Sequence, residues 1–170
     1  MAAILPRYRP LTILLLATGL RIGEALGLRP EDVSPDTGTI TIARTWDSHT
    51  GRLADAPKTA GSRRIIPATD AVLQAIATTA PVGGRIFGAV ELTAYRRALH
   101  QAGQAAGIPF RVTPHVLRHT HASWLLQAGA DVTVVAAQLG HSSVATTAIY
   151  GHVSLDSTRA AVERIPHFTA

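Results

Sequence analysis

Apolar residues recur along most of this chain at the three- and four-residue spacing that is typical of helices. The run LTILLLATGLRIGEALGL follows Pro10 and predicts one mostly buried helix that ends near Gly27. Arg21 interrupts this run, so we expect its side chain to be partly buried and to need a partner. Further helical patterns, several of them preceded by a capping residue or a proline, cover residues 71–80, 91–106, 115–129, 132–140, 144–150 and 154–164.

Between residues 39 and 67 the helical spacing gives way to short runs that are typical of strands. Strands are predicted at 39–44, 52–56 and 63–67, and the links DSHTG and KTAGS carry the turn residues of hairpins. The expected fold class is therefore mainly α with a small three-stranded antiparallel β-sheet. Because the chain has no internal repeat, low-complexity segment or evident linker, residues 1–170 are interpreted as one domain.

The composition excludes several classes of protein. Cysteine is absent, which rules out disulfide scaffolds and thiolate metal sites and favours a cytoplasmic location. The longest apolar stretch, residues 11–20, is too short to span a bilayer, and the first residues lack a secretory pattern, so no membrane partner is expected. A net charge of +5 and a pI of about 10.7 suit a polyanionic partner, of which nucleic acid is the commonest.

The basic residues are almost all arginine: of the 16, only Lys58 is a lysine. A GC-rich genome would produce the same bias, so the bias by itself says little about function. Where arginine is the default, however, a single lysine suggests a position whose chemistry arginine cannot perform, because a guanidinium is essentially never deprotonated.

Polar residues occupy five places where a core pattern does not require them, namely Arg21, Lys58, His115 with Arg118, His141 and Tyr150. Each has an ordinary structural explanation. Glu24 could simply neutralise Arg21, or it could orient Arg21 toward a ligand phosphate. His115 and Arg118 share a helix face beside the free N–H groups of a helix start, which favours an anion, but for this pair by itself two solvated side chains are the preferred explanation. Lys58 could be an exposed turn residue, His141 could cap a helix, and Tyr150 could be a core residue.

The order and surroundings of these residues resemble a known family. TGLRIGEALGL is similar to the first arginine box of the tyrosine recombinases, the phage integrase family, and TPHVLRHTHASWLLQAGADVTVVAAQLGHSSVATTAIYGHV is similar to their second box. Between the boxes, the predicted sheet carries Lys58 where the family has its β-hairpin lysine. The resemblance covers roughly residues 10–155 and implies the catalytic-domain fold of the DNA breaking–rejoining enzymes.

The resemblance implies a site-specific recombinase or integrase, a DNA strand-transferase. Tyr150 is expected to attack the scissile phosphodiester and form a 3′-phosphotyrosine, which a DNA 5′-hydroxyl attacks in the rejoining step. Arg21 and Arg118 are expected to hold the non-bridging oxygens of that phosphate. Lys58 is expected to protonate the departing 5′-oxygen, and His115 to accept the proton of the tyrosine.

Other residues are expected to support this set. His141 would hydrogen-bond a phosphate oxygen. Glu24 and His119 would shape the pocket without touching DNA, whereas Arg63 and Arg64 would contact the DNA. No metal or other cofactor is expected, because the arginines replace the charge of a metal ion.

The expected partner is double-stranded DNA. Members of the family act as tetramers that exchange C-terminal tails, and here residues 152–170 would be that tail. The alternative is a tail packed on its own domain, with the protein a monomer when free. Family members also carry an N-terminal core-binding domain, which is expected to be absent from this chain.

Three rival interpretations remain open from the sequence. The chain could be a truncated, catalytically impaired DNA-binding fragment, or a type IB topoisomerase-like enzyme that relaxes DNA. It could also be a metal hydrolase, since His115 and His119 have the i, i+4 spacing of a zinc pair and His121 lies on the same predicted helix. No HExxH motif or evident third ligand accompanies them.

Overall fold

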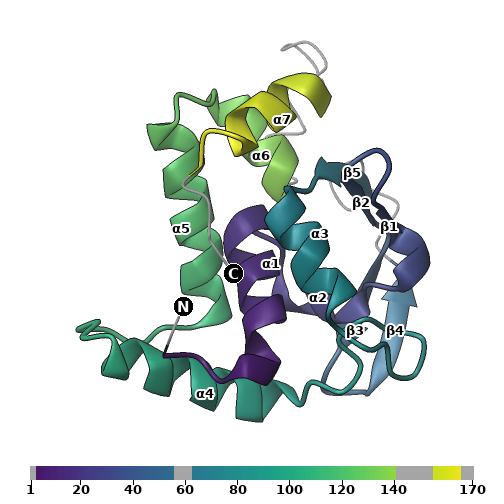
Figure 1. The fold of residues 1–170 in the computed structure, drawn as a ribbon, viewed down its shortest axis with the longest axis vertical. Helices are drawn as coiled ribbons and strands as arrows, with labels where there is room; N and C mark the ends of the chain where they lie inside the picture. The colour runs from purple at the N-terminus through teal and green to yellow at the C-terminus, as the bar shows by residue number, and fades with distance from the viewer. Residues whose placement is uncertain (1–2, 56–62, 141–154, 166–170) are drawn as a thin grey trace.

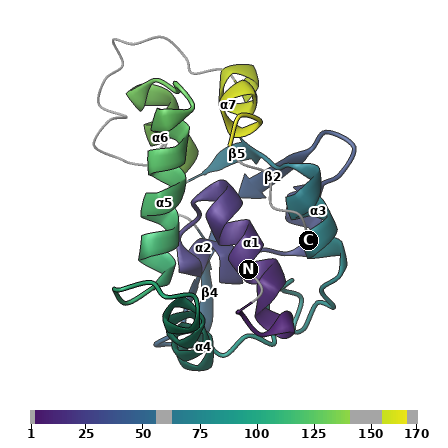
Figure 2. The same cartoon turned by 60° about the vertical axis from the view of Figure 1, so that its left-hand side comes forward.

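The computed structural model describes residues 3–55, 63–140 and 155–165, and within these ranges the chain is mainly helical (Figure 1). Its helices, in chain order, are η1 (Pro6–Tyr8), α1 (Arg9–Thr18), α2 (Ile22–Gly27), η2 (Pro30–Asp32), α3 (Asp70–Ala77), α4 (Leu92–Ala105), α5 (Pro114–Gln127), α6 (Val132–Leu139) and α7 (Leu155–Val162). α1 lies at the centre, with α3 and α5 packed against it. α4 crosses one end of α5, and α6 and α7 lie toward the other end (Figures 1 and 2).

The first apolar run forms two helices rather than the single helix that its pattern predicts. α1 ends at Thr18, where Gly19 adopts a left-handed conformation (φ 66°) and its N–H donates to the Leu15 carbonyl at 3.0 Å. Arg21 then has an extended backbone and caps the start of α2. The single-helix prediction was wrong because a glycine in this conformation ends a helix even where the apolar spacing continues.

The predicted fold class is confirmed, but the strands differ in detail from the predicted ones. They are β1 (Val33–Ser34), β2 (Thr39–Ile42), β3 (Arg44–Asp47), β4 (Arg52–Asp55) and β5 (Arg64–Pro67). β2 pairs antiparallel with β1 and β5 in a three-stranded sheet, whereas β3 and β4 form a separate two-stranded sheet. The predicted strand 39–44 is therefore wrong as one element: β2 buries Ile40 and Ile42 in the core, whereas β3 packs on α2.

The two-stranded sheet lies close to α2 because that helix presents two glycines to it. A Cβ on Gly23 would lie 2.6 Å from the Thr45 hydroxyl oxygen, and one on Gly27 would lie 3.2 Å from the Thr45 backbone. The absence of side chains there lets the two backbones approach. Arg85 adds a further link, because its guanidinium stacks on the Trp46 ring at 3.5 Å. Together these contacts fix the backbone that follows Arg21.

The main apolar core surrounds α1, whose Leu11, Leu14 and Leu15 are fully buried. Tyr95 of α4 enters this core, and its hydroxyl lies 3.2 Å from the Thr12 hydroxyl. Burial raises the pKa of the Tyr95 phenol well above its ordinary value, so this tyrosine stays protonated. A smaller cluster joins α5 and α6 to α7 and consists of Leu125, Val135, Leu139, Ala161, Val162 and Ile165.

Within residues 3–55, 63–140 and 155–165, no helix has both the length and the apolar character that crossing a bilayer requires.

Candidate active site

The structure brings Arg21 and Arg118 to the same turn of backbone. Arg118, on α5, donates through Nη1 to the Gly19 carbonyl at 2.7 Å and through Nη2 to the Leu139 carbonyl at 2.8 Å. Arg21 donates through Nη2 to the carbonyl of the next residue, Gly140, at 3.2 Å. The two guanidinium groups therefore join the α1–α2 turn to the end of α6 and lie near each other. These bonds do not test the phosphate-binding role expected of either arginine.

These two arginines differ in their exposure. Arg118 is only 5% exposed, whereas half of the Arg21 side chain is open to solvent. The Arg21 side chain is thus half covered, in line with the partial burial expected, but the helix break at Gly19 places it at a helix start and not inside one long helix. Burial lowers the pKa of Arg118 to about 10, and the neighbouring positive charge of Arg21 contributes. Arg118 therefore remains charged at neutral pH.

Glu24 is the anion that holds this cationic cluster together. Its carboxylate accepts the Arg21 backbone N–H at 2.8 Å and Arg21 Nη1 at 3.1 Å. It also accepts both terminal nitrogens of Arg64 at 3.0 Å each, a two-pronged pair. Burial by itself would raise the pKa of Glu24, but the hydrogen bonds and charges of Arg64 and Arg21 outweigh it and hold that pKa below its ordinary value.

Arg63 and Arg64, both expected to contact DNA, lie in different environments. Arg63 is exposed, just before β5. The Arg64 side chain is only 8% exposed, and its Nε donates to the Gln138 carbonyl at 3.0 Å while its terminal nitrogens bind Glu24. Arg64 thus ties β5 to α2 and to α6, a role that its position in the sequence did not suggest.

His115 and His119 lie one turn apart on α5 and are both exposed. The helix begins as predicted, with Pro114 in its first turn and the Thr113 hydroxyl accepting the Val116 N–H at 3.3 Å. The two imidazole rings meet edge to face, with centroids 4.3 Å apart and Nε2 atoms 2.9 Å apart. His119 therefore contacts His115 directly.

His121 has a structural place that sequence reasoning missed. It is fully buried, and its Nδ1–H donates to the Leu16 carbonyl at 3.0 Å. A Cβ on Gly19 would lie 2.6 Å from its ring, so the imidazole fills the space beside the α1–α2 turn. Burial lowers the pKa of His121 to about 4, and the ring is neutral at pH 7. His121 points away from the exposed pair and supports the turn before Arg21.

Three of the predicted site residues, Lys58, His141 and Tyr150, lie outside the described residues. Their neighbours in the chain can still be placed. Gly140, which precedes His141, is buried at the end of α6, and its carbonyl accepts a hydrogen bond from Arg21 Nη2. The predicted site residues that the structure describes are Arg21, Glu24, Arg63, Arg64, His115, Arg118 and His119.

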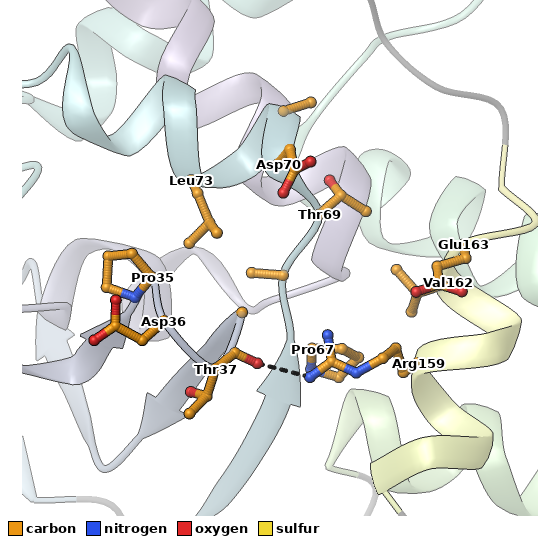
Figure 3. Close-up of a pocket in the computed structure, with 13 residues that line it drawn as sticks. Pro35, Asp36, Thr37, Pro67, Thr69, Asp70, Leu73, Arg159, Val162 and Glu163 are labelled. Atoms are coloured by element: carbon orange, nitrogen blue, oxygen red, sulfur yellow. Dashed lines mark hydrogen bonds between the residues drawn. The ribbon is translucent and has the colours of Figure 1, made fainter.

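A separate hollow of about 400 Å³ lies between α7, the turn at residues 35–38 and the start of α3 (Figure 3). Arg159 reaches across it from α7 and donates through Nη2 to the Thr37 carbonyl at 2.8 Å. The lining of this hollow includes neither Arg21 nor Arg118. The hollow lies where α7 contacts the rest of the domain, and it is separate from the cluster of Arg21 and Arg118.

Arg21 is held by the buried Glu24 carboxylate and lies near Arg118, whose helix also carries the exposed imidazole pair. Guanidinium and imidazole groups are donors that can bind the oxygens of a phosphate. The chain belongs to the phage integrase family, whose model matches residues 2–156.

Curated relatives agree. The chain is 35% identical to tyrosine recombinase XerD of Corynebacterium glutamicum, an alignment that covers 90% of this chain and 50% of that protein. It is 33% identical to tyrosine recombinase XerC of Halalkalibacterium halodurans, with 90% and 52% covered. The chain thus spans about half the length of these relatives.

Solved structures share the fold. The Tn1549 transposon integrase in complex with circular intermediate DNA matches with a TM-score of 0.69 and 26% identity, over 93% of this chain and 59% of that one. The XerA recombinase matches with a TM-score of 0.63 and 26% identity, over 95% and 57%. These neighbours confirm the fold that the two sequence boxes implied.

Proposed function

We propose that this chain carries the catalytic centre of a site-specific DNA recombinase, which cleaves one DNA strand and joins it to another. The observation that carries the proposal is the meeting of Arg21 and Arg118 at the backbone of Leu139 and Gly140, immediately before His141. The names of the similar proteins, recombinases and an integrase in complex with DNA, favour recombination over a topoisomerase-like reaction.

The proposed chemistry is a transesterification that keeps the number of phosphate ester bonds constant. The Tyr150 oxygen bonds to phosphorus while the bond to the DNA 5′-oxygen breaks, which leaves a 3′-phosphotyrosine and a 5′-hydroxyl. The phenol proton passes to His115, and Lys58 supplies the proton that the 5′-oxygen needs. A 5′-hydroxyl from another strand then attacks the phosphotyrosine, so no nucleotide cofactor is required for rejoining.

The two arginines would stabilise the charge that builds on the non-bridging oxygens. Arg118 is oriented before DNA arrives, because the Gly19 and Leu139 carbonyls hold it. Those two bonds need only two of the five N–H donors of a guanidinium, which leaves others for a phosphate. Arg21 is more open and can close on the DNA. Fixed donors of this kind stabilise a transition state without the cost of reorganisation.

Arg64 takes a different part in this proposal from the direct DNA contact expected from the sequence. Its side chain is buried against Glu24 and the Gln138 carbonyl, so it acts through Glu24 as a positioning residue for Arg21. Arg63, exposed just before the same strand, is the better placed of the two to contact the DNA backbone. His141, next to Gly140, would complete the phosphate contacts.

The C-terminal helix is the proposed link between subunits on DNA. In this structure α7 packs on its own domain through Ala161, Val162 and Ile165 and through the Arg159–Thr37 bond. The apolar seam is small, and the hollow beside it leaves part of α7 without close packing (Figure 3). We infer that the free chain is a monomer and that four copies exchange this segment on DNA. Light scattering with and without a cleavable duplex tests this, and a monomer on that duplex would contradict it.

Covalent capture tests the proposed reaction. A library of random duplexes with a nick that lets the cleaved end diffuse away is incubated with the chain in EDTA, and protein–DNA adducts are isolated under denaturing conditions. We expect adducts from the natural chain and from Tyr95→Phe, whose phenol is buried on Thr12. We expect none from Tyr150→Phe. An adduct from Tyr150→Phe, or cleavage that requires a metal, would overturn the proposal.

A further inference from the structure

The exposed imidazole pair of α5 has the geometry of a metal chelate. His115 and His119 come from successive turns of one helix, and their Nε2 atoms are 2.9 Å apart. This contact needs one N–H and one lone pair, so a single proton bridges the two rings in the neutral state. We propose that a divalent transition metal, zinc in particular, takes the place of this hydrogen bond and binds both Nε2 atoms, while the ring that donated its Nε2 proton carries that proton on Nδ1 instead.

The distances favour this exchange. Zinc binds imidazole nitrogen at about 2.0–2.1 Å, so two nitrogens at a tetrahedral angle around one ion lie about 3.4 Å apart. The pair must therefore open by only about half an ångström. Both rings are exposed, so side-chain rotation accomplishes this without disturbing the core. Arg118 adds little local hindrance, because its terminal nitrogens point to the Gly19 and Leu139 carbonyls.

The site would be a two-nitrogen site completed by water. In the parts of the chain that the structure describes, no group of three or more His, Cys, Asp or Glu side chains is arranged to hold a metal. His121, the remaining histidine of α5, is buried on the Leu16 carbonyl and faces elsewhere. Structural zinc sites use four protein ligands, so this site would bind and release zinc reversibly rather than stabilise the fold permanently.

Occupancy would have a consequence for the reaction, and this step rests on the proposed function. A zinc ion on Nε2 of His115 takes the lone pair that would accept the Tyr150 proton. Zinc would therefore inhibit strand cleavage, and a chelator would restore it. At a zinc concentration ten times the dissociation constant, about one tenth of the cleavage rate should remain.

Metal binding can be tested without DNA. We expect zinc at ten times its dissociation constant to raise the unfolding midpoint of the natural chain by about 3 to 6 °C. His119→Gln should lose most of this shift. The matched control is His49→Gln, which removes a single exposed histidine from the β3–β4 turn and should keep the shift. An equal shift in His119→Gln would overturn the inference.

Copper provides a second measurement, because Cu²⁺ binds imidazole more tightly than zinc does. Electron paramagnetic resonance of the protein with one equivalent of Cu²⁺ should show coupling to two nitrogens, and the His119→Gln spectrum should lose one of them. An unchanged nitrogen count would argue against the site.

Measurements of DNA cleavage separate the proposed metal site from the proposed recombinase function. If the metal-free natural chain forms no DNA adduct, the proposed recombinase function falls, while the melting and resonance results still decide on the metal site. If the natural chain cleaves DNA equally well with and without saturating zinc, the inhibitory role is wrong. Magnesium at the same concentration is the control and should leave the cleavage rate unchanged, because it prefers oxygen ligands.

Discussion

Arg64 and Glu24 form a buried, two-pronged ion pair, with both terminal nitrogens of the arginine 3.0 Å from the two carboxylate oxygens. The same carboxylate holds the backbone and the guanidinium of Arg21. One acidic side chain thus connects β5 to the helix start that presents a proposed phosphate ligand. The geometry of Arg21 depends on a residue that is 40 positions away from Glu24 in the chain.

Glu24→Gln should destabilise the fold, because it removes the carboxylate that neutralises the buried Arg64. We expect the free energy of unfolding to fall by about 3 kcal/mol, the cost of breaking a buried ion pair by removing one partner. Denaturant titration measures this. The matched control is Glu31→Gln, in an exposed pair with Arg29, and it should leave the unfolding midpoint unchanged. Equal midpoints for both variants would show that Glu24 has no such structural part.

Gly19→Ala should be more damaging than the same change at another glycine of similar backbone conformation. Gly19 has φ +66°, and a Cβ there would lie 2.6 Å from the His121 ring and 2.6 Å from a Leu139 methyl group. Gly51 has φ +64°, and a Cβ there would meet nothing within 4 Å. We expect a loss of about 1 kcal/mol for Gly51→Ala and about 2–4 kcal/mol for Gly19→Ala. Thermal or denaturant unfolding measures these losses of stability. Similar losses at both positions would show that crowding at Gly19 does not destabilise the alanine variant.

His121 should make the stability depend on pH below neutrality. Its pKa is about 4 in the folded state against an ordinary value of 6.5, so the unfolded chain binds the extra proton between these values. The contribution is complete above pH 6.5 and is lost as the pH falls toward 4. We expect the stability advantage over His121→Leu to shrink by about 3 kcal/mol between pH 7 and pH 4. His49→Gln, at an exposed turn, should keep the natural pH profile, and a His121→Leu profile parallel to the natural one would contradict the prediction.

Arg21→Lys should separate chemistry from folding. The Arg21 side chain is half exposed, so a lysine there should leave the free energy of unfolding within about 1 kcal/mol of the natural value. Adduct formation, in contrast, should slow by about 100-fold or more, because an ammonium cannot bind a phosphate through two parallel N–H donors. Arg29→Lys, at another surface arginine, should form adducts at the natural rate. A natural rate from Arg21→Lys would remove Arg21 from the proposed site.

Features that depend on neighbouring residues could be predicted from the sequence by itself. Thr113 and Pro114 begin α5 where expected, Asp131 caps α6 through the Thr133 N–H at 2.8 Å, and Gly140 ends it in a left-handed conformation. Capping bonds span two to four residues, so the local sequence determines them. The two arginine boxes, through their resemblance to a known family, were enough to indicate the family that the comparisons show.

Only the tertiary structure decided which way the polar side chains of the site face. Arg64 looked like a surface cation beside Arg63, but it is buried on Glu24; His121 looked like a third member of a histidine cluster, but it packs beneath Gly19. These arrangements join segments far apart in the chain, as the Arg118–Gly19 bond does across 99 positions. A sequence pattern records the spacing of side chains along one element, whereas the partner that neutralises a buried charge is selected when separate elements pack together.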